Sequence, residues 1–373
     1  MTVLILSQRL DYHGRAVKWG LEQIGVPCDW WDRSLHPVTQ AISISFADTR
    51  AELGIAGAQV SLERGFYTSI WERRGRVPSA SKKLARADKT VALSESRKLL
   101  DGIVSIIEER NPTAMLVNAA REHFRAGEKV FQLDVASQVG LKTPLTLVSN
   151  DPAAIREFRR SLSGKVVAKQ HFPFSWRQSN GDLLLSGTYL LPDEAFEIDE
   201  VLSACPMIYQ ERLDIVDELR VTVFGGTIFT GRQPRSRESA RGYSDIRLES
   251  RDSMIPAVLA THTKDKLIQL VERLGLLFAA IDIAVCRNGD FVFLECNEAG
   301  QFLSYEQFNP NEPMLDSFCQ FLAKGDPEFV LEKPSGISLA QFDRSPDGIA
   351  FKEEYSRHFR EEYEGAPFEL ADH

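Results

Sequence analysis

Residues 280–297 have the sequence Ala280-Ile-Asp282-Ile-Ala-Val-Cys-Arg-Asn-Gly-Asp-Phe-Val-Phe-Leu-Glu295-Cys-Asn297. Two apolar runs flank an Asn-Gly pair, which favours the tight turn of a β-hairpin. Residues two apart on a strand share a face, so Asp282, Glu295 and Asn297 can point to the same side of this hairpin. The segment therefore predicts two antiparallel strands that carry three oxygen-bearing side chains on one face.

These three side chains have the chemistry of a magnesium site. Mg²⁺ prefers carboxylate and carbonyl oxygens, keeps several waters and bridges substrate phosphates. Phenylalanine and leucine side chains crowd around Glu295, and a carboxylate in such a setting is costly to bury without a cation. The alternative is that Asp282 is exposed at a strand end and Glu295 caps an edge. We predict that Asp282, Glu295 and Asn297 are metal ligands.

Three cationic residues on neighbouring elements suit a phosphate. Lys129 lies in a predicted helix over 126–140, and Lys169 ends an apolar strand, where an unpaired ammonium would be unfavourable. Each lysine could reach a phosphate, or could pair with a carboxylate or extend to solvent. Arg220 lies on a strand beside the hairpin and could stabilise charge on a transferring phosphoryl group or acyl phosphate. Glu218 could instead simply pair with Arg220.

The linker after the predicted strand 207–210 suits a nucleobase. Backbone groups of Glu211 and Leu213, next to Gln210, could bind a flat adenine between apolar faces, and a nearby carboxylate could bind ribose.

Further along, an arginine-rich segment could clamp phosphate or an acidic peptide through forked hydrogen bonds, or could be a mobile surface loop. Its arginines are Arg232, Arg235, Arg237, Arg241, Arg247 and Arg251.

Length and composition place these motifs in a multidomain enzyme. The chain has 373 residues and a formal charge of −9, which argues against binding to a nucleic-acid backbone. No run approaches the roughly 20 apolar residues of a membrane helix, and residues 1–7 resemble a buried strand rather than a signal peptide. Five scattered cysteines fit reduced thiols. We therefore predict a cytoplasmic protein of the α/β class, since strands and helices alternate in the first third.

The ordered series of Lys129, Lys169, Gln210-Glu211, Glu218-Leu-Arg220, Asp282 and Glu295-Cys-Asn297 resembles the ATP-grasp superfamily. Within it, the sequence is most similar to microviridin-type graspetide maturases, which join side chains of a ribosomally made precursor peptide. Segments that carry this likeness include Ile70-Trp-Glu-Arg-Arg74, Lys129-Val-Phe-Gln-Leu133, Glu218-Leu-Arg-Val-Thr-Val and Glu295-Cys-Asn-Glu-Ala-Gly-Gln-Phe302. The likeness extends to about residue 325.

The resemblance implies a set of roles. Lys129 and Lys169 would hold ATP phosphates, Gln210 to Leu213 the adenine, and Glu218 the ribose. The three hairpin residues would hold two Mg²⁺ ions, and Arg220, with Lys169 and Arg232, would act in catalysis. A substrate Asp or Glu carboxylate would become an acyl phosphate that a Thr, Ser or Lys side chain attacks. The partner would be a precursor peptide with a leader segment, and a homodimer is possible.

The resemblance also implies a domain order. Residues 1–125 would form an N-terminal pre-ATP-grasp α/β domain, 126–212 a central α+β subdomain, 213–330 a C-terminal subdomain with the metal site, and 331–373 a charged tail. Two other functions fit the same residues. One is a ligase that adds an amino acid to a small molecule or protein terminus, as in the similar glutamate ligases of ribosomal protein. The other is a nucleotide-binding module without catalysis.

Overall fold

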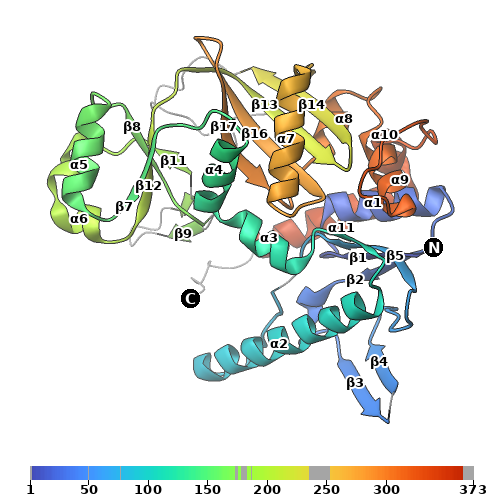
Figure 1. Ribbon diagram of the computed structural model, residues 1–373. Coiled ribbons are helices and arrows are strands. Elements are labelled where there is room, and N and C mark those ends of the chain that lie inside the picture. Colours follow the sequence, from blue (N-terminus) through green and yellow to red (C-terminus); the bar gives the residue numbers. More distant parts are fainter. Residues whose placement is uncertain are drawn as a thin grey trace.

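The N-terminal part is a four-stranded parallel sheet with helices around it (Figure 1). The computed structural model describes residues 2–48, 50–75, 77–172, 175–177, 183–185, 187–234 and 253–363. The strand order is β2-β1-β5-β6. Its elements are β1 (Thr2–Leu6), α1 (Tyr12–Gln23), β2 (Cys28–Trp31), β5 (Tyr67–Glu72), α2 (Arg86–Arg110) and β6 (Met115–Val117). Parallel strands joined by helical crossovers match the predicted α/β class.

An antiparallel hairpin projects from this part, as Figure 1 shows. It consists of β3 (Ile42–Ala47) and β4 (Arg50–Ile55). Ile44 and Leu53 pair across the strands and pack against the cluster around α2, while Phe46 near the tip is 69% exposed. Alternation of apolar and polar residues, which has the period of a strand, gives the hairpin one packed face.

The central part is a four-stranded antiparallel sheet with the order β11-β8-β12-β7, next to which α5 and α6 lie. Its elements are β7 (Thr146–Ser149), α5 (Pro152–Ser161), β8 (Val166–Lys169), β11 (Thr188–Tyr189), α6 (Asp199–Ser203) and β12 (Met207–Glu211), with a separate pair β9 (Ser175–Arg177) and β10 (Leu183–Leu185). The helix predicted over 126–140 is present as α4 (Lys129–Gln138), and a separate helix, α3 (Ala120–Gly127), precedes it. The break falls after Gly127, a residue that weakens a helix.

The next sheet has five strands in the order β15-β14-β13-β16-β17. Its strands are β13 (Ile215–Phe224), β14 (Thr227–Pro234), β15 (Ile255–Pro256), β16 (Phe278–Cys286) and β17 (Phe291–Asn297). The predicted hairpin of β16 and β17 is present, and Gly289 in its turn has φ +87°, which favours glycine. From the sequence, residues 207–210, 219–224 and 227–230 are expected to form one antiparallel sheet, with Gly225-Gly226 as the turn between the last two. That was wrong, because the chain leaves β12 for a different sheet at Arg212 to Asp214.

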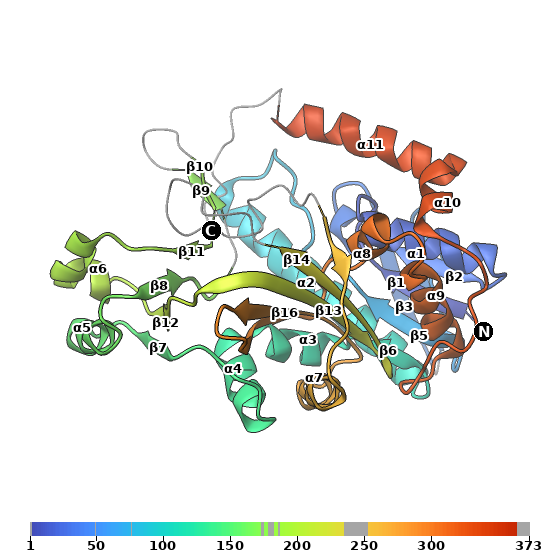
Figure 2. The same cartoon turned by 90° about the horizontal axis from the view of Figure 1, so that it is seen from above.

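Two helices cover one face of the five-stranded sheet. Figure 2 shows α4 and α7 (Thr261–Arg273) on the same side of β13 and β16. Leu219, Ile281 and Ile283 of the sheet pack with Leu267 and Leu270 of α7. The opposite face carries the predicted site. At one end this opposite face is apolar, with Phe224 and Phe278 buried in a core, and further along it carries the polar side chains of the predicted site.

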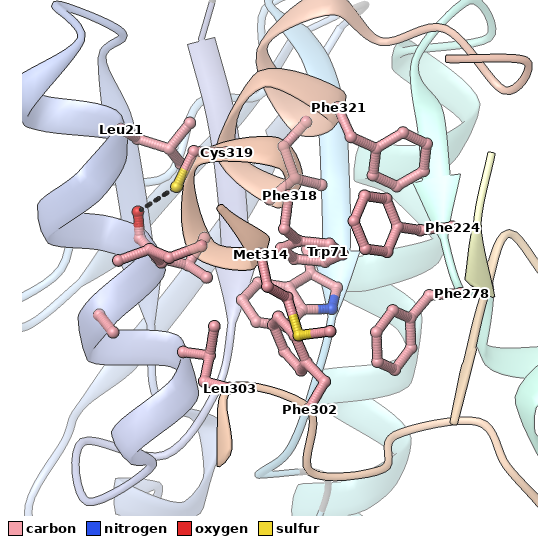
Figure 3. Packing of buried hydrophobic residues seen from close by; sticks show 14 of the residues in the cluster. Leu21, Trp71, Phe224, Phe278, Phe302, Leu303, Met314, Phe318, Cys319 and Phe321 are labelled. Atoms are coloured by element: carbon pink, nitrogen blue, oxygen red, sulfur yellow. Dashed lines mark hydrogen bonds between the residues drawn. The ribbon is translucent and has the colours of Figure 1, made fainter. Parts of the chain in front are cut away.

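A second core joins the N-terminal sheet to the five-stranded sheet. Figure 3 shows Phe318 of α9 (Met314–Lys324) between Trp71 of β5 and the phenylalanines at the ends of β13 and β16, Phe224 and Phe278. The ring centroids of Phe318 and Trp71 are 4.9 Å apart. This aromatic core fixes the two sheets relative to each other.

The C-terminal region consists of α8 (Ser304–Phe308), α9, and two helices of the predicted tail, α10 (Leu339–Arg344) and α11 (Pro346–Tyr363). After about Asp343 the sequence predicts a charged, solvated helix followed by a frayed end. The helix is present as α11, but the tail is not wholly solvated. Phe342 and Phe351 are buried, and Tyr12 donates to Asp343 over 2.9 Å. The described part of the chain has no helix long and apolar enough to cross a membrane.

Candidate active site

A β-bulge in β17 decides which side chains share the site. Asp282 pairs with Glu295, but the next residue of β16, Ile283, pairs with Phe293, so Leu294 is the extra residue. A one-residue shift moves all following side chains to the other face of a strand. Glu295 and Asn297 therefore face the same side as Asp282, while Cys296 points into the helix-covered core.

The three predicted metal ligands converge on that face. Asn297 Nδ2 lies 3.4 Å from Asp282 Oδ2 and 3.3 Å from Glu295 Oε1. The amide thus places a hydrogen-bond donor between two carboxylates, at the position where a cation would neutralise them. A half turn of the amide group presents its oxygen instead. The residues present therefore fit a hard cation.

The donor set is two carboxylates and one amide. Within the ranges that the structure describes, no group of three or more His, Cys, Asp and Glu side chains could hold a metal ion, so the predicted site depends on Asn297 as the third ligand. Such a set leaves coordination positions open. Mg²⁺ usually keeps several waters and takes further oxygens from substrate phosphates, so a sparse protein set suits it.

Arg220 lies beside these ligands. It is directly opposite Asp282 in the pairing of β13 and β16, and its Nη1 donates to Asp282 Oδ1 over 2.7 Å. Nη2 donates to the carbonyl oxygen of Gln301 over 3.0 Å. The side chain of Arg220 is 17% exposed, so its charge is partly shielded from water. In this position it can stabilise negative charge that develops beside the three predicted metal ligands.

The two predicted phosphate lysines approach from the central part. Lys129 begins α4, and its Nζ lies 4.0 Å from Glu295 Oε2 and donates to the carbonyl oxygen of Gln170 over 3.0 Å. Lys169 is the last residue of β8, directly before Gln170. Lys129 therefore connects the end of β8 with the hairpin of β16 and β17. Lys169 lies at that same end of β8.

The predicted adenine linker runs between the two sheets. Gln210 is buried and donates to Thr146 Oγ1 over 3.0 Å, and Glu211 binds the backbone of Leu145 through both its N–H and its carboxylate. A cavity of about 420 Å³ lies beside Glu211 to Asp214, with Val292 and Cys286 on its other wall. Leu213 packs with these apolar residues. The linker thus borders a hollow that is apolar at Leu213, Cys286 and Val292 and is otherwise lined by charged and polar side chains.

Glu218 and Arg232 lie on opposite faces of the sheet. Glu218 is two residues before Arg220 on β13, is buried, and shares the face of Arg220. Arg232 pairs in register with Leu219, and its Nη1 lies 3.6 Å from Asp217 Oδ2. Strand alternation therefore points Arg232 away from Arg220 and Asp282. The structure does not bring Arg232 together with the other predicted residues. The rest of the arginine-rich segment lies outside the described residues, namely Arg235, Arg237, Arg241, Arg247 and Arg251.

Sequence reasoning missed a buried ionic group that supports the site from the N-terminal part. Arg73 Nε lies 3.2 Å from Asp11 Oδ2, and its Nη1 donates to the carbonyl oxygens of Ala299 and Gly300. Burial lowers the pKa of Arg73 to about 10. Burial opposes ionisation of Asp11, but Arg73 and its other neighbours lower the pKa of that carboxyl. This group holds the loop that follows the metal ligands.

Gly300 explains how closely that loop approaches the site. A Cβ atom there would lie 2.5 Å from Ala280 Cβ, 2.8 Å from Arg220 Nη2 and 3.0 Å from Asn297 Cβ. Only glycine fits such a contact without moving its neighbours. The Glu295-Cys-Asn-Glu-Ala-Gly sequence held this signal, because a glycine shortly after a strand often marks a close backbone approach.

Comparisons with known proteins show the fold. No family model and no curated protein matches the sequence, whereas many solved structures match the chain. Macrocyclase MdnC from Microcystis aeruginosa MRC, bound with precursor peptide MdnA, is 23% identical with a TM-score of 0.76, covering 87% of this chain and 100% of that one.

Two further structures agree. A RiPP-associated ATP-grasp ligase from Chryseobacterium gregarium, in complex with ADP and a leader and core peptide, is 21% identical with a TM-score of 0.73, covering 87% of this chain and 95% of that one. The ATP-grasp ligase PsnB, complexed with minimal precursor, Mg and ADP, is 22% identical with a TM-score of 0.66, covering 87% and 97%. The predicted ATP-grasp fold is therefore confirmed.

Proposed function

We propose that this chain is an ATP-dependent ligase that cross-links side chains of a ribosomally made precursor peptide, as a graspetide maturase does. The observation that supports the proposal most directly is that Asp282, Glu295 and Asn297 gather on one face beside Arg220 and Lys129. Solved structures of the same fold hold precursor peptides, nucleotide and Mg. A shared fold alone does not define a substrate, so the proposal depends on the site.

The nucleotide would lie between the central sheet and the five-stranded sheet. Lys129 and Lys169, from the junction at the end of β8, would bind its phosphates as point charges. Backbone groups of Glu211 and Leu213 would bind the adenine, with Gln210 supporting the linker, and Glu218 would bind ribose hydroxyls. The hollow beside the linker supports this placement.

Asp282, Glu295 and Asn297 would hold the metal, for which we propose two Mg²⁺ ions. When bound, Mg²⁺ supplies positive charge that offsets the charge of the phosphate oxygens and helps to position them. The protein residues contribute orientation. Arg220 binds one oxygen of Asp282 and so keeps that carboxylate and its own guanidinium in fixed relation.

The reaction would proceed in two steps. In the first step, an oxygen of a substrate Asp or Glu carboxylate attacks the γ-phosphorus of ATP. The bond between the γ-phosphorus and the oxygen that bridges it to the β-phosphate breaks. The products are ADP, which leaves, and an acyl phosphate on the peptide. A Thr or Ser hydroxyl or a Lys amine of the peptide then attacks the acyl carbon, phosphate leaves, and the nucleophile loses its proton. Arg220 would stabilise the charge on the acyl phosphate and on the departing phosphate.

The remaining predictions about assembly stay proposals. We propose that the chain recognises a leader segment of its peptide, that it forms a homodimer, and that it acts in the cytoplasm without binding nucleic acid or membrane. The domain bounds at 125, 212 and 330 also stay our proposal, with Arg232 retained as a residue to be tested.

Co-expression tests the function. The protein is produced together with a short candidate precursor peptide rich in Thr, Ser, Asp and Glu, and the intact mass of the peptide is measured. Each ester or amide bond should remove the mass of one water, and co-expression with an Asp282→Asn variant should leave the mass unchanged. A peptide of unaltered mass with the wild-type enzyme would contradict the proposal. A gain in mass equal to an added amino acid would support the amino-acid ligase instead.

A further inference from the structure

Gln132 is a buried amide that joins three segments next to the site. It lies on α4, three residues after Lys129, and is 3% exposed. Its Nε2 donates to the carbonyl oxygen of Cys296 over 2.7 Å and to that of Ala126 over 2.6 Å, and its Oε1 accepts from the N–H of Cys296 over 2.9 Å. The side chain therefore binds both backbone groups of one residue in β17.

This contact replaces a missing strand. β17 is the last strand of its sheet. On its outer side Val292 bridges to Lys142, but no strand of the described part of the chain pairs with that side at Cys296. At Cys296 these groups are covered by α4, and a buried peptide group without a partner is costly. Gln132 satisfies both the donor and the acceptor. Of the two ends of the Gln132 amide, only the NH₂ group can donate to the two carbonyl oxygens. The contacts therefore fix the orientation of the amide.

The clamped residue lies between two predicted metal ligands. Cys296 is flanked by Glu295 and Asn297, and the bulge at Leu294 turns its side chain into the core. Holding both peptide groups of Cys296 fixes the direction in which its two neighbours project. The same helix carries Lys129, one turn earlier, with its Nζ 4.0 Å from Glu295. The hydrogen bonds between Gln132 and Cys296 thus set the direction in which the two predicted ligands project.

We propose that Gln132 is a positioning residue that sets the affinity of the site for Mg²⁺ through the backbone of Cys296. This inference rests on the proposed function, because it assumes that Glu295 and Asn297 bind the metal. Gln132 itself touches neither metal nor nucleotide. Groups that orient metal ligands from behind typically change metal affinity or activity by about tenfold to a hundredfold when removed.

The test uses the full-length protein and ADP as the probe. In Gln132→Met the side chain keeps nearly the same volume but loses all three hydrogen bonds. The control is Gln138→Met on the same helix, since Gln138 is exposed. It donates to Asp134 of α4 and accepts from Arg273 of α7, and these contacts involve neither β17 nor a predicted ligand. Titration calorimetry measures ADP binding in EDTA and at increasing Mg²⁺ concentrations. Hydrogen exchange of the Cys296 amide reports directly on the lost contact.

We expect a specific pattern. Gln132→Met should require about tenfold to a hundredfold more Mg²⁺ for the same gain in ADP affinity, should bind ADP in EDTA as the wild type does, and should reach wild-type affinity at high Mg²⁺. The Cys296 amide should exchange faster. Gln138→Met should behave as the wild type in every measurement.

Three results would overturn the inference. They are an unchanged Mg²⁺ requirement in Gln132→Met, an equal loss of ADP affinity with and without Mg²⁺, and unchanged exchange at Cys296. If Gln132→Met does not fold, Gln132→Glu keeps the acceptor for the Cys296 N–H, loses both donors, and is expected to show the same Mg²⁺ shift. Wild-type protein whose ADP affinity is indifferent to Mg²⁺ would instead overturn the proposed function.

Discussion

Arg220 and Asp282 face each other across β13 and β16, with Nη1 of the arginine 2.7 Å from Oδ1 of the aspartate. The second nitrogen, Nη2, binds the carbonyl oxygen of Gln301. The guanidinium is therefore held from two sides before any substrate arrives. A charge that is already in position needs little reorganisation when negative charge develops near it.

The first prediction concerns this arginine. Arg220→Ala should lower kcat for peptide-dependent ADP release by about 10² to 10³, as removal of one preorganised donor does in other enzymes. Arg232→Ala, on the opposite face of the sheet, should have a much smaller effect. Steady-state assays of both variants with the peptide check this. Equal losses in the two variants would contradict the placement that separates them.

The second prediction concerns the metal. Removal of Mg²⁺ with EDTA should abolish ADP release, and added Mg²⁺ should restore it. Glu295→Gln removes one of the two charges that would hold the ion, so it should raise the Mg²⁺ concentration needed for half-maximal rate by at least about tenfold. A Mg²⁺ titration of the rate measures this. Full activity in EDTA would rule out the proposed ligand set.

The third prediction concerns the aromatic core between the two sheets. Phe318 is fully buried, with Trp71, Phe224, Phe278 and Phe302 around it. Phe318→Ala should lower the free energy of unfolding by about 3–5 kcal/mol, because it removes apolar burial and leaves a cavity.

Chemical denaturation measures the loss, with Phe46→Ala as a control. Phe46 is 69% exposed on the projecting hairpin, so its replacement should change stability by less than about 0.5 kcal/mol. A loss of similar size in the two variants would show that the aromatic core is not what holds the sheets together.

The fourth prediction concerns pH. Burial, with a contribution from Arg73, lowers the pKa of His13 from its ordinary value of 6.5 to about 3. Between these values the unfolded chain binds a proton at His13 and the folded chain does not. Stability from this residue is therefore complete above pH 6.5 and falls as the pH drops towards 3, by at most about 1.4 kcal/mol per pH unit.

His13→Gln provides the comparison, since an amide can still accept the hydrogen bond from the N–H of Leu303 but does not titrate. The free energy of unfolding is measured for both proteins from pH 7 to 4.5. The wild type should lose stability more steeply than the variant over this range. Parallel curves would mean that His13 is protonated in the folded state.

The sequence predicted the site hairpin because its evidence is local. Two apolar runs, the Asn-Gly turn and the positions of Asp282, Glu295 and Asn297 lie within one short segment. The bulge at Leu294 was not predictable. In the apolar run from Phe291 to Leu294 every residue could face either side, so the phase of the strand depends on packing that the run does not encode.

Other features depended on distant residues. Eight of the eleven residues of α9 are buried, among them the polar Asp316 and Ser317. Burial of these polar side chains depends on the elements packed around the helix, which the sequence of the helix does not encode. Arg73 acts on Ala299, which lies far away in the sequence, and no local pattern connects the two. The split of strands between two sheets at Arg212 likewise results from tertiary packing.

The extra residue at position 294 divides β17 into two halves. Odd-numbered residues face the helices in the first half and the predicted site in the second half. Replacing that leucine leaves both halves in place. Deleting it would rotate Glu295 and Asn297 into the helix-packed interior and expose Cys296, which exchanges the two sides of the strand in one event. Homologues of this chain should therefore differ at position 294 by substitution only. Insertions and deletions should occur instead in the turn at 287–290.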